Sequence, residues 1–164
     1  MKAIALTIFA VALSVQVNLG QRGVNQLVGT WRLVSAFAVN TDGRRTEAPY
    51  GPNPTGLITY TDDGRMSAVI SYGGRRPLTE GDRVSAPESE RAEAFATSFG
   101  YAGRYSFSGS QVTHHVEVST VQNWVDTDLV RTVALGESRL TLRTPPMSVG
   151  GATRTTQLIF ERVK

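Results

Sequence analysis

Residues 56–71 read GLITYTDDGRMSAVIS, and this stretch decides the fold class. On both sides of its centre, apolar and polar side chains alternate with the period of two that is typical of a half-buried β-strand. The centre, Asp62-Asp63-Gly64, places a glycine where a tight hairpin turn requires a positive φ. The stretch therefore predicts an antiparallel hairpin made of residues 56–61 and 65–71.

Short alternating segments separated by turn residues continue through the rest of the chain. Including the hairpin, they predict about eight strands, at residues 27–39, 56–61, 65–71, 105–107, 111–119, 129–135, 139–144 and 153–163. Most of the connections are too short for crossover helices, which favours an all-β antiparallel meander over βαβ units. In the first strand, strict alternation predicts two faces: Trp31, Leu33 and Phe37 on one, and Val34, Ala36 and Ala38 on the other.

One segment has the period of a helix instead. Ser85-Ala86-Pro87-Glu88 has the form of a capping box, and the apolar residues that follow recur at helical spacing, at Ala92, Phe95, Ala96 and Phe99. Gly100 and Gly103 are expected to end the helix. We predict one short amphipathic helix between the third and fourth strands, with Phe95 and Phe99 as a lid over apolar surface or, alternatively, as a face for a partner.

Eight antiparallel strands expose two edges unless the sheet closes on itself. A closed barrel of about eight strands has an interior that side chains fill, or that holds one small ligand. Alternation places apolar residues on the inner face together with a few polar ones, as in the set Val112, His114, Val116 and Val118 and the set Arg154, Thr156, Leu158, Phe160 and Arg162. This mixture favours a lined pocket over a dry core.

Length and composition limit the function classes. The 164 residues suit one domain, and 40% hydrophobic residues with a net charge of +3 exclude disorder over most of the chain. Without cysteine there is no disulfide, thiolate nucleophile or thiolate metal site. The arginines are interleaved with acids, which disfavours a nucleic-acid partner.

The first residues are typical of a targeting segment. Lys2 precedes an apolar run over residues 3–15, the pattern of a secretory signal peptide. We therefore expect a signal peptide over residues 1–20, export to the periplasm or the medium, and a single domain over residues 21–164; an uncleaved N-terminal helix is the alternative. No later stretch approaches the ~20 apolar residues of a membrane span.

Gly29-Thr30-Trp31 has the Gly-x-Trp form that opens the barrel of lipocalins. Longer stretches are similar to the bacterial and fungal lipocalin-like domain family, a calycin-type β-barrel, namely LVGTWRLVS (27–35), GPNPTGLITYTDDGRMS (51–67), VTHHVE (112–117), NWVDTDLVR (123–131) and LTLRTPPMSVGG (140–151). The resemblance implies that Trp31, introduced by Gly29, closes one end of the barrel. It also implies that an arginine of the last strand, best matched by Arg162, packs on that tryptophan.

His114 is the first candidate for chemistry. Alternation places it inside the barrel and places His115 and Glu117 outside. An interior imidazole could act as a general acid or base or orient a ligand, or it could be a structural histidine with its own partners. His115 and Glu117 supply only two ligands, so neither a metal site nor another cofactor is expected.

Arg131 is the second candidate, because it shares a strand face with Leu129 and Val133. A guanidinium on the inner face needs a carboxylate, supplied either by Asp128 or by a bound acid such as a fatty or polyketide acid. Further wall or rim candidates are Trp124, Tyr60, Met66, Phe95 and Phe99.

The sequence thus favours binding or transport of one small hydrophobic or amphipathic molecule. Two alternatives remain open. One is a cyclase or isomerase without metal, with His114 as its catalytic group, and the other is an envelope or stress protein with a filled barrel. The oligomeric state stays open.

Overall fold

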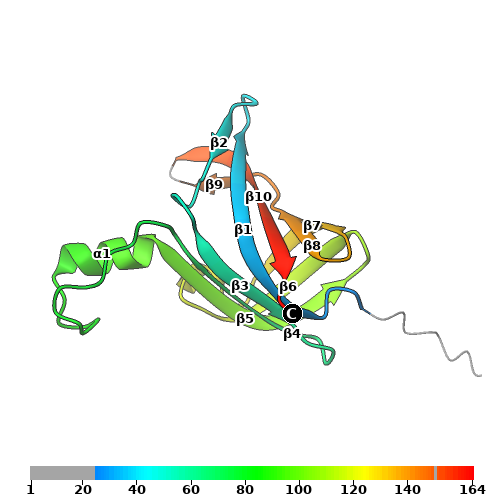
Figure 1. Ribbon diagram of the computed structural model, residues 1–164, viewed down its shortest axis with the longest axis horizontal. Coiled ribbons are helices and arrows are strands. Elements are labelled where there is room, and N and C mark those ends of the chain that lie inside the picture. Colours follow the sequence, from blue (N-terminus) through cyan, green and yellow to red (C-terminus); the bar gives the residue numbers. More distant parts are fainter. Residues whose placement is uncertain (1–24, 150) are drawn as a thin grey trace, which may run out of the picture.

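The computed structural model describes residues 25–149 and 151–164 (Figure 1). The predicted signal peptide, residues 1–20, lies outside the described residues. In chain order the elements are β1 (Gly29–Asn40), β2 (Arg45–Glu47), β3 (Thr55–Tyr60), β4 (Arg65–Ser71), α1 (Glu88–Ala96), β5 (Ser98–Phe107), β6 (Gln111–Ser119), the 3-10 helix η1 (Gln122–Trp124), β7 (Asp128–Leu135), β8 (Arg139–Arg143), β9 (Met147–Val149) and β10 (Ala152–Arg162). The hairpin predicted around residues 62–64 is present as β3 and β4.

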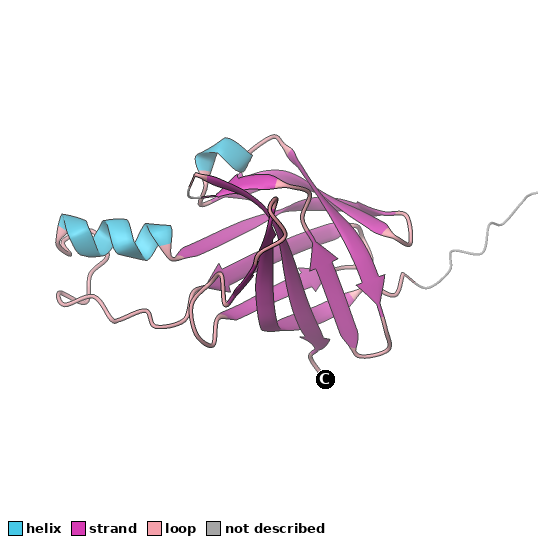
Figure 2. Cartoon of the chain, turned by 90° about the horizontal axis from the view of Figure 1, so that it is seen from above, coloured by secondary structure: helices cyan, strands magenta, loops and turns pink. Residues whose placement is uncertain are grey.

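The strands form one antiparallel sheet in the order β2-β1-β3-β4-β5-β6-β7-β8-β10-β9. β1 also pairs with β10, so eight strands, β1, β3 to β8 and β10, close into a barrel (Figures 1 and 2). The short strands β2 and β9 extend the sheet beside β1 and β10. The prediction of an all-β, eight-stranded antiparallel barrel is confirmed.

The helix begins later and ends earlier than predicted. α1 starts at Glu88 and follows four strands rather than three, because the short strand β2 was not predicted. Ser85 does not cap it; the Ser85 hydroxyl donates to Asp82 Oδ2 at 2.8 Å, and the N-cap residue is Pro87. Phe99 belongs to strand β5, so the prediction of a helical Phe95/Phe99 face is wrong.

Gly103, expected to end the helix, lies inside β5 at an irregularity of its pairing with β6. A Cβ atom on this residue would lie 2.0 Å from the backbone oxygen of His115. The glycine is therefore required by the close approach of two strands, not by a helix terminus.

α1 projects from the barrel beyond the start of β5 (Figures 1 and 2). None of its residues is buried, and Phe95 is 57% exposed. The helix is therefore not a lid over the core. No helix in the described part of the chain has the length and apolarity needed to cross a membrane.

Bulges break the alternation of two strands. In β1 the register with β10 shifts between Leu33 and Ser35, and Val34 is the extra residue. Beyond this bulge Ala36 and Ala38 are buried, while Phe37 stacks under the Arg45 guanidinium at 3.8 Å. The predicted faces of this strand are therefore wrong after Val34.

The second bulge lies in the pairing of β5 with β6. As a result Val118, predicted to face inward, is 61% exposed. Val112 and Val116, before the bulge, are buried as predicted.

Trp31 closes one end of the barrel. Its side chain is fully buried, and Nε1 donates to the backbone oxygen of Leu27 at 2.8 Å. The Arg162 guanidinium lies 4.0 Å from the Trp31 ring and donates to the backbone oxygens of Val28 and Gln26. Gly29 has a φ of +131°, and a Cβ there would lie 2.6 Å from Arg162 Nη1. These are the positions that the family resemblance implied for Gly29, Trp31 and Arg162.

Arg162→Ala is expected to lower the free energy of unfolding by about 2–4 kcal/mol. It removes one cation–π contact and two charged hydrogen bonds to backbone oxygens. Urea unfolding followed by tryptophan fluorescence measures the change. The control is Arg139→Ala, which removes an exposed ion pair with Glu161 and is expected to change stability by less than about 1 kcal/mol. Equal effects of the two variants would contradict a special role for Arg162.

Candidate ligand-binding cavity

A cavity of about 280 Å³ lies inside the barrel, toward the end where β4 leads to α1 and β6 leads to η1. Its volume is at the lower end of the range for small-molecule sites. Much of its wall consists of inward-facing apolar residues of the strands, among them Ile58, Ala68, Ile70, Leu142, Leu158 and Phe160. Its polar side chains are three tyrosines, two threonines, one serine and one arginine, namely Tyr50, Tyr72, Tyr101, Thr144, Thr156, Ser98 and Arg131.

A chain of aromatic rings lines one side of this cavity. Tyr50 lies between Tyr72, with ring centroids 4.9 Å apart, and Phe99, at 6.0 Å. Phe99 packs edge to face on Trp124 at 5.4 Å, and Trp124 contacts Tyr101 at 5.8 Å. Such rings offer a ligand apolar faces together with hydroxyl and indole groups at their edges.

Arg131 lies on the inner face of β7, between Leu129 and Val133, and is only 8% exposed. Its Nη1 donates to the backbone oxygen of Val130 at 2.8 Å, and its positive charge partly offsets the burial that raises the pKa of Tyr101. None of the ion pairs in the described part of the chain includes Arg131.

Asp128, the partner considered from the sequence, faces outward. It bonds His115 Nδ1 at 2.7 Å on the surface of the barrel. No aspartate or glutamate of the described residues lines the cavity, so its charge is that of one buried guanidinium.

His114 is fully buried, and both of its ring nitrogens have partners. The Tyr60 hydroxyl lies 2.8 Å from Nε2, and the Tyr101 hydroxyl lies 3.0 Å from Nδ1. Burial first, and then the charge of Arg131, lowers the pKa of His114 to about 3. The imidazole is therefore neutral at physiological pH.

His114 joins two tyrosines in a chain of hydrogen bonds, Tyr101 at Nδ1 and Tyr60 at Nε2. A neutral imidazole carries one proton, so it donates to one of the two tyrosine oxygens and accepts from the other hydroxyl. Burial raises the pKa of both tyrosines, so all three groups are neutral.

The structure brings together four of the seven predicted ligand-binding residues and separates the other three. Arg131, Trp124, Phe99 and Phe95 line the cavity, with Phe95 contributing from the last turn of α1. The remaining three are buried but do not line it: His114, Tyr60 and Met66. Tyr101 lines the cavity and bonds His114, so it stands between the imidazole and any bound molecule.

The lining residues that were not predicted include Tyr50, Thr144 and Met147. Thr144 continues the inward alternation of Leu140 and Leu142 and could have been found by that signal. Tyr50 lies in an irregular loop without alternation. Burial, together with the proximity of Tyr72, raises its pKa to about 12.

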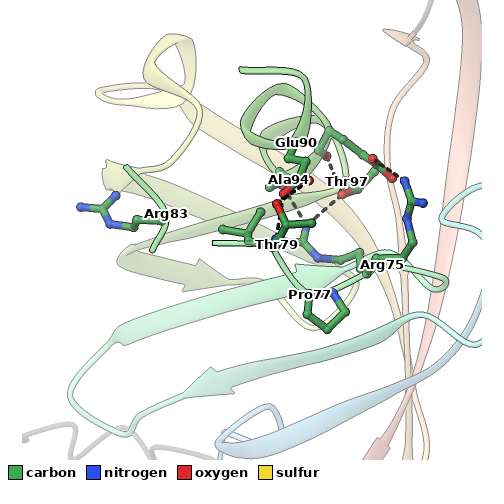
Figure 3. Close-up of a pocket in the computed structure, with 10 residues that line it drawn as sticks. Arg75, Pro77, Thr79, Arg83, Glu90, Ala94 and Thr97 are labelled. Carbon is green, nitrogen blue, oxygen red and sulfur yellow. Dashed lines mark hydrogen bonds and ion pairs between the residues drawn. The ribbon is translucent and has the colours of Figure 1, made fainter. Parts of the chain in front are cut away.

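A second cleft, of about 310 Å³, lies outside the barrel between α1 and the segment 75–83 (Figure 3). Several of its polar groups bond one another. Arg75 Nη1 donates to the Ala94 oxygen and to Thr97 Oγ1, and the Thr79 backbone and hydroxyl donate to the Glu90 carboxylate. These bonds tie the segment to the projecting helix, and we interpret the cleft as part of that junction.

The sequence profile described as lipocalin-like domain matches residues 28–163. The chain belongs to this family. A solved structure similar to this lipocalin-like domain is that of a mutant of the fluorescent protein UnaG, with 13% sequence identity and a TM-score of 0.37. The match covers 86% of this chain and 99% of that one. No curated protein sequence matches significantly. Within the described ranges, no three histidine, aspartate or glutamate side chains are grouped as metal ligands would be.

The depressed pKa of His114 predicts an acid-sensitive fold. His114 binds a proton near pH 6.5 in the unfolded chain but only near pH 3 in the folded chain. Its contribution to the free energy of unfolding is therefore fully present above pH 6.5 and is lost as the pH falls toward 3. The single histidine contributes up to about 1.4 kcal/mol per pH unit to this slope.

Urea unfolding of wild type and His114→Gln between about pH 7 and pH 4 measures the contribution. The variant is expected to show the shallower dependence, because glutamine does not titrate. His115→Gln, on the outer face, should keep the wild-type slope. A variant at position 114 that lost stability in parallel with wild type would show that His114 is protonated in the fold.

Proposed function

We propose that this lipocalin-like domain binds or transports one small, mainly apolar molecule in the barrel cavity. The observation that carries the proposal is the cavity of about 280 Å³ bounded by apolar strand residues and an aromatic wall. We include in the proposal that the protein acts after export, as the sequence of residues 1–20 suggests.

The driving force for binding would be removal of apolar surface from water, at about 25 cal/mol per Å². The cavity has the volume of about nine liquid water molecules, so the enclosed part of a ligand is small. A longer molecule would extend toward solvent past Phe95, which lines the cavity and is 57% exposed.

The geometry supports a binding protein better than the alternatives considered. A barrel filled by its own side chains would leave no cavity of this size. A cyclase or isomerase that used His114 would need the imidazole to reach its substrate, and Tyr101 lies between them. For such chemistry the group in contact with substrate would be Tyr101 itself.

Filling the cavity tests the proposal. Ala68 lines it from β4, while its neighbour Val69 points outward and is 57% exposed. Ala68→Phe is expected to weaken binding of a neutral fluorescent probe such as N-phenylnaphthylamine by at least about tenfold, because the new ring occupies the site. Fluorescence titration measures the affinity, and circular dichroism checks the fold.

Val69→Phe is the matched control, since it adds the same ring to the outer face of the same strand. It should bind the probe as wild type does. Equal binding by both variants, or no binding of apolar probes by wild type, would contradict a ligand site inside the barrel.

A further inference from the structure

We infer that the ligand is an apolar acid whose single carboxylate pairs with Arg131 while its apolar part fills the cavity. This inference rests on the proposed function and specifies the chemical class of its ligand. It is carried by the arrangement of charge inside the barrel.

Among the described residues, Arg131 is a buried cation with no carboxylate partner. A charge removed from water is strongly unfavourable unless a partner of opposite charge compensates for it. The guanidinium has five N–H donors, and the described residues give it one hydrogen-bond acceptor, the backbone oxygen of Val130. The side chain lines the cavity, so its remaining donors are available to a bound molecule.

A carboxylate fits these donors better than a neutral group does. It accepts two parallel N–H bonds from the planar guanidinium, and both bonds are strengthened by charge in a site of low polarity. The cavity contains no carboxylate of the described chain that would compete for Arg131 or repel an acid. The neighbouring Tyr50, Tyr60, Tyr101 and His114 stay neutral, since burial shifts their pKa values away from the physiological range.

Packing alone does not explain an arginine at this position. The inner face of β7 is otherwise apolar at Leu129 and Val133. An apolar residue of similar length at position 131 would fill the same space without a buried charge, and replacing buried charged groups in this way is often neutral or stabilising. A carboxylate ligand supplies the missing partner and gives the charge a role.

The wild-type protein provides the first test. Displacement of N-phenylnaphthylamine by decanoic acid, decanol and decylamine at neutral pH compares three head groups on one chain length. We expect decanoate to bind about 10- to 100-fold more tightly than decanol, because a hydrogen bond to a charged group is lost with the alcohol. Decylamine should bind most weakly, since its cation faces Arg131.

Arg131→Met provides the second test, with Arg143→Met as its control on the outer face of β8. Arg131→Met should lose the preference for decanoate over decanol, because the methionine offers no charged donor to the carboxylate. It should also unfold at the same urea concentration as wild type or a higher one, whereas a merely structural arginine would leave it less stable. The control should keep the wild-type preference.

The outcomes separate the inference from the proposed function. Probe binding without a preference for decanoate in wild type would overturn the inference and leave the proposed function standing. Absence of any probe or ligand binding would overturn both. If Arg131→Met does not fold, the wild-type comparison of decanoate with decanol decides the inference by itself.

Discussion

The pairing of β1 with β10 is the constraint on which the rest of the structure depends. It joins the first long strand to the last over a ladder from Trp31–Arg162 to Asn40–Arg154. Without it the meander would be an open sheet with two exposed edges and no interior. The same pairing brings Arg162 onto Trp31, so that closure of the cylinder and closure of one of its ends are parts of one interaction.

Closure also sets the chemistry of the interior. The inward side chains share a space of low polarity, in which each polar group needs a partner. Tyr101, His114 and Tyr60 satisfy one another, and burial keeps the imidazole neutral. Arg131 lines the cavity, where the barrel is hollow. Among the described residues, the interior thus combines an internally satisfied polar chain with one charge that faces the open space.

Sequence patterns predicted the fold and much of the wall of the site. Turn residues and alternation were sufficient for the hairpin of β3 and β4, and alternation placed Arg131 and His114 on the inner face. Alternation failed where a strand contains an extra residue, as at Val34, because a bulge arises from pairing with another strand. The helix boundary failed at Ser85 because Asp82 binds its hydroxyl.

The sequence by itself determined the strand periodicity, the turns, and which residues of a regular strand share a face, since these depend on local backbone geometry. Only the tertiary structure decided that Asp128 pairs with His115 and not with Arg131. Only the tertiary structure likewise decided that His114 lies behind Tyr101, and that Tyr50 reaches the cavity from a loop. These are distances between side chains on different strands and loops. They are set by closure of the barrel and by its bulges, and no pattern along one segment encodes them.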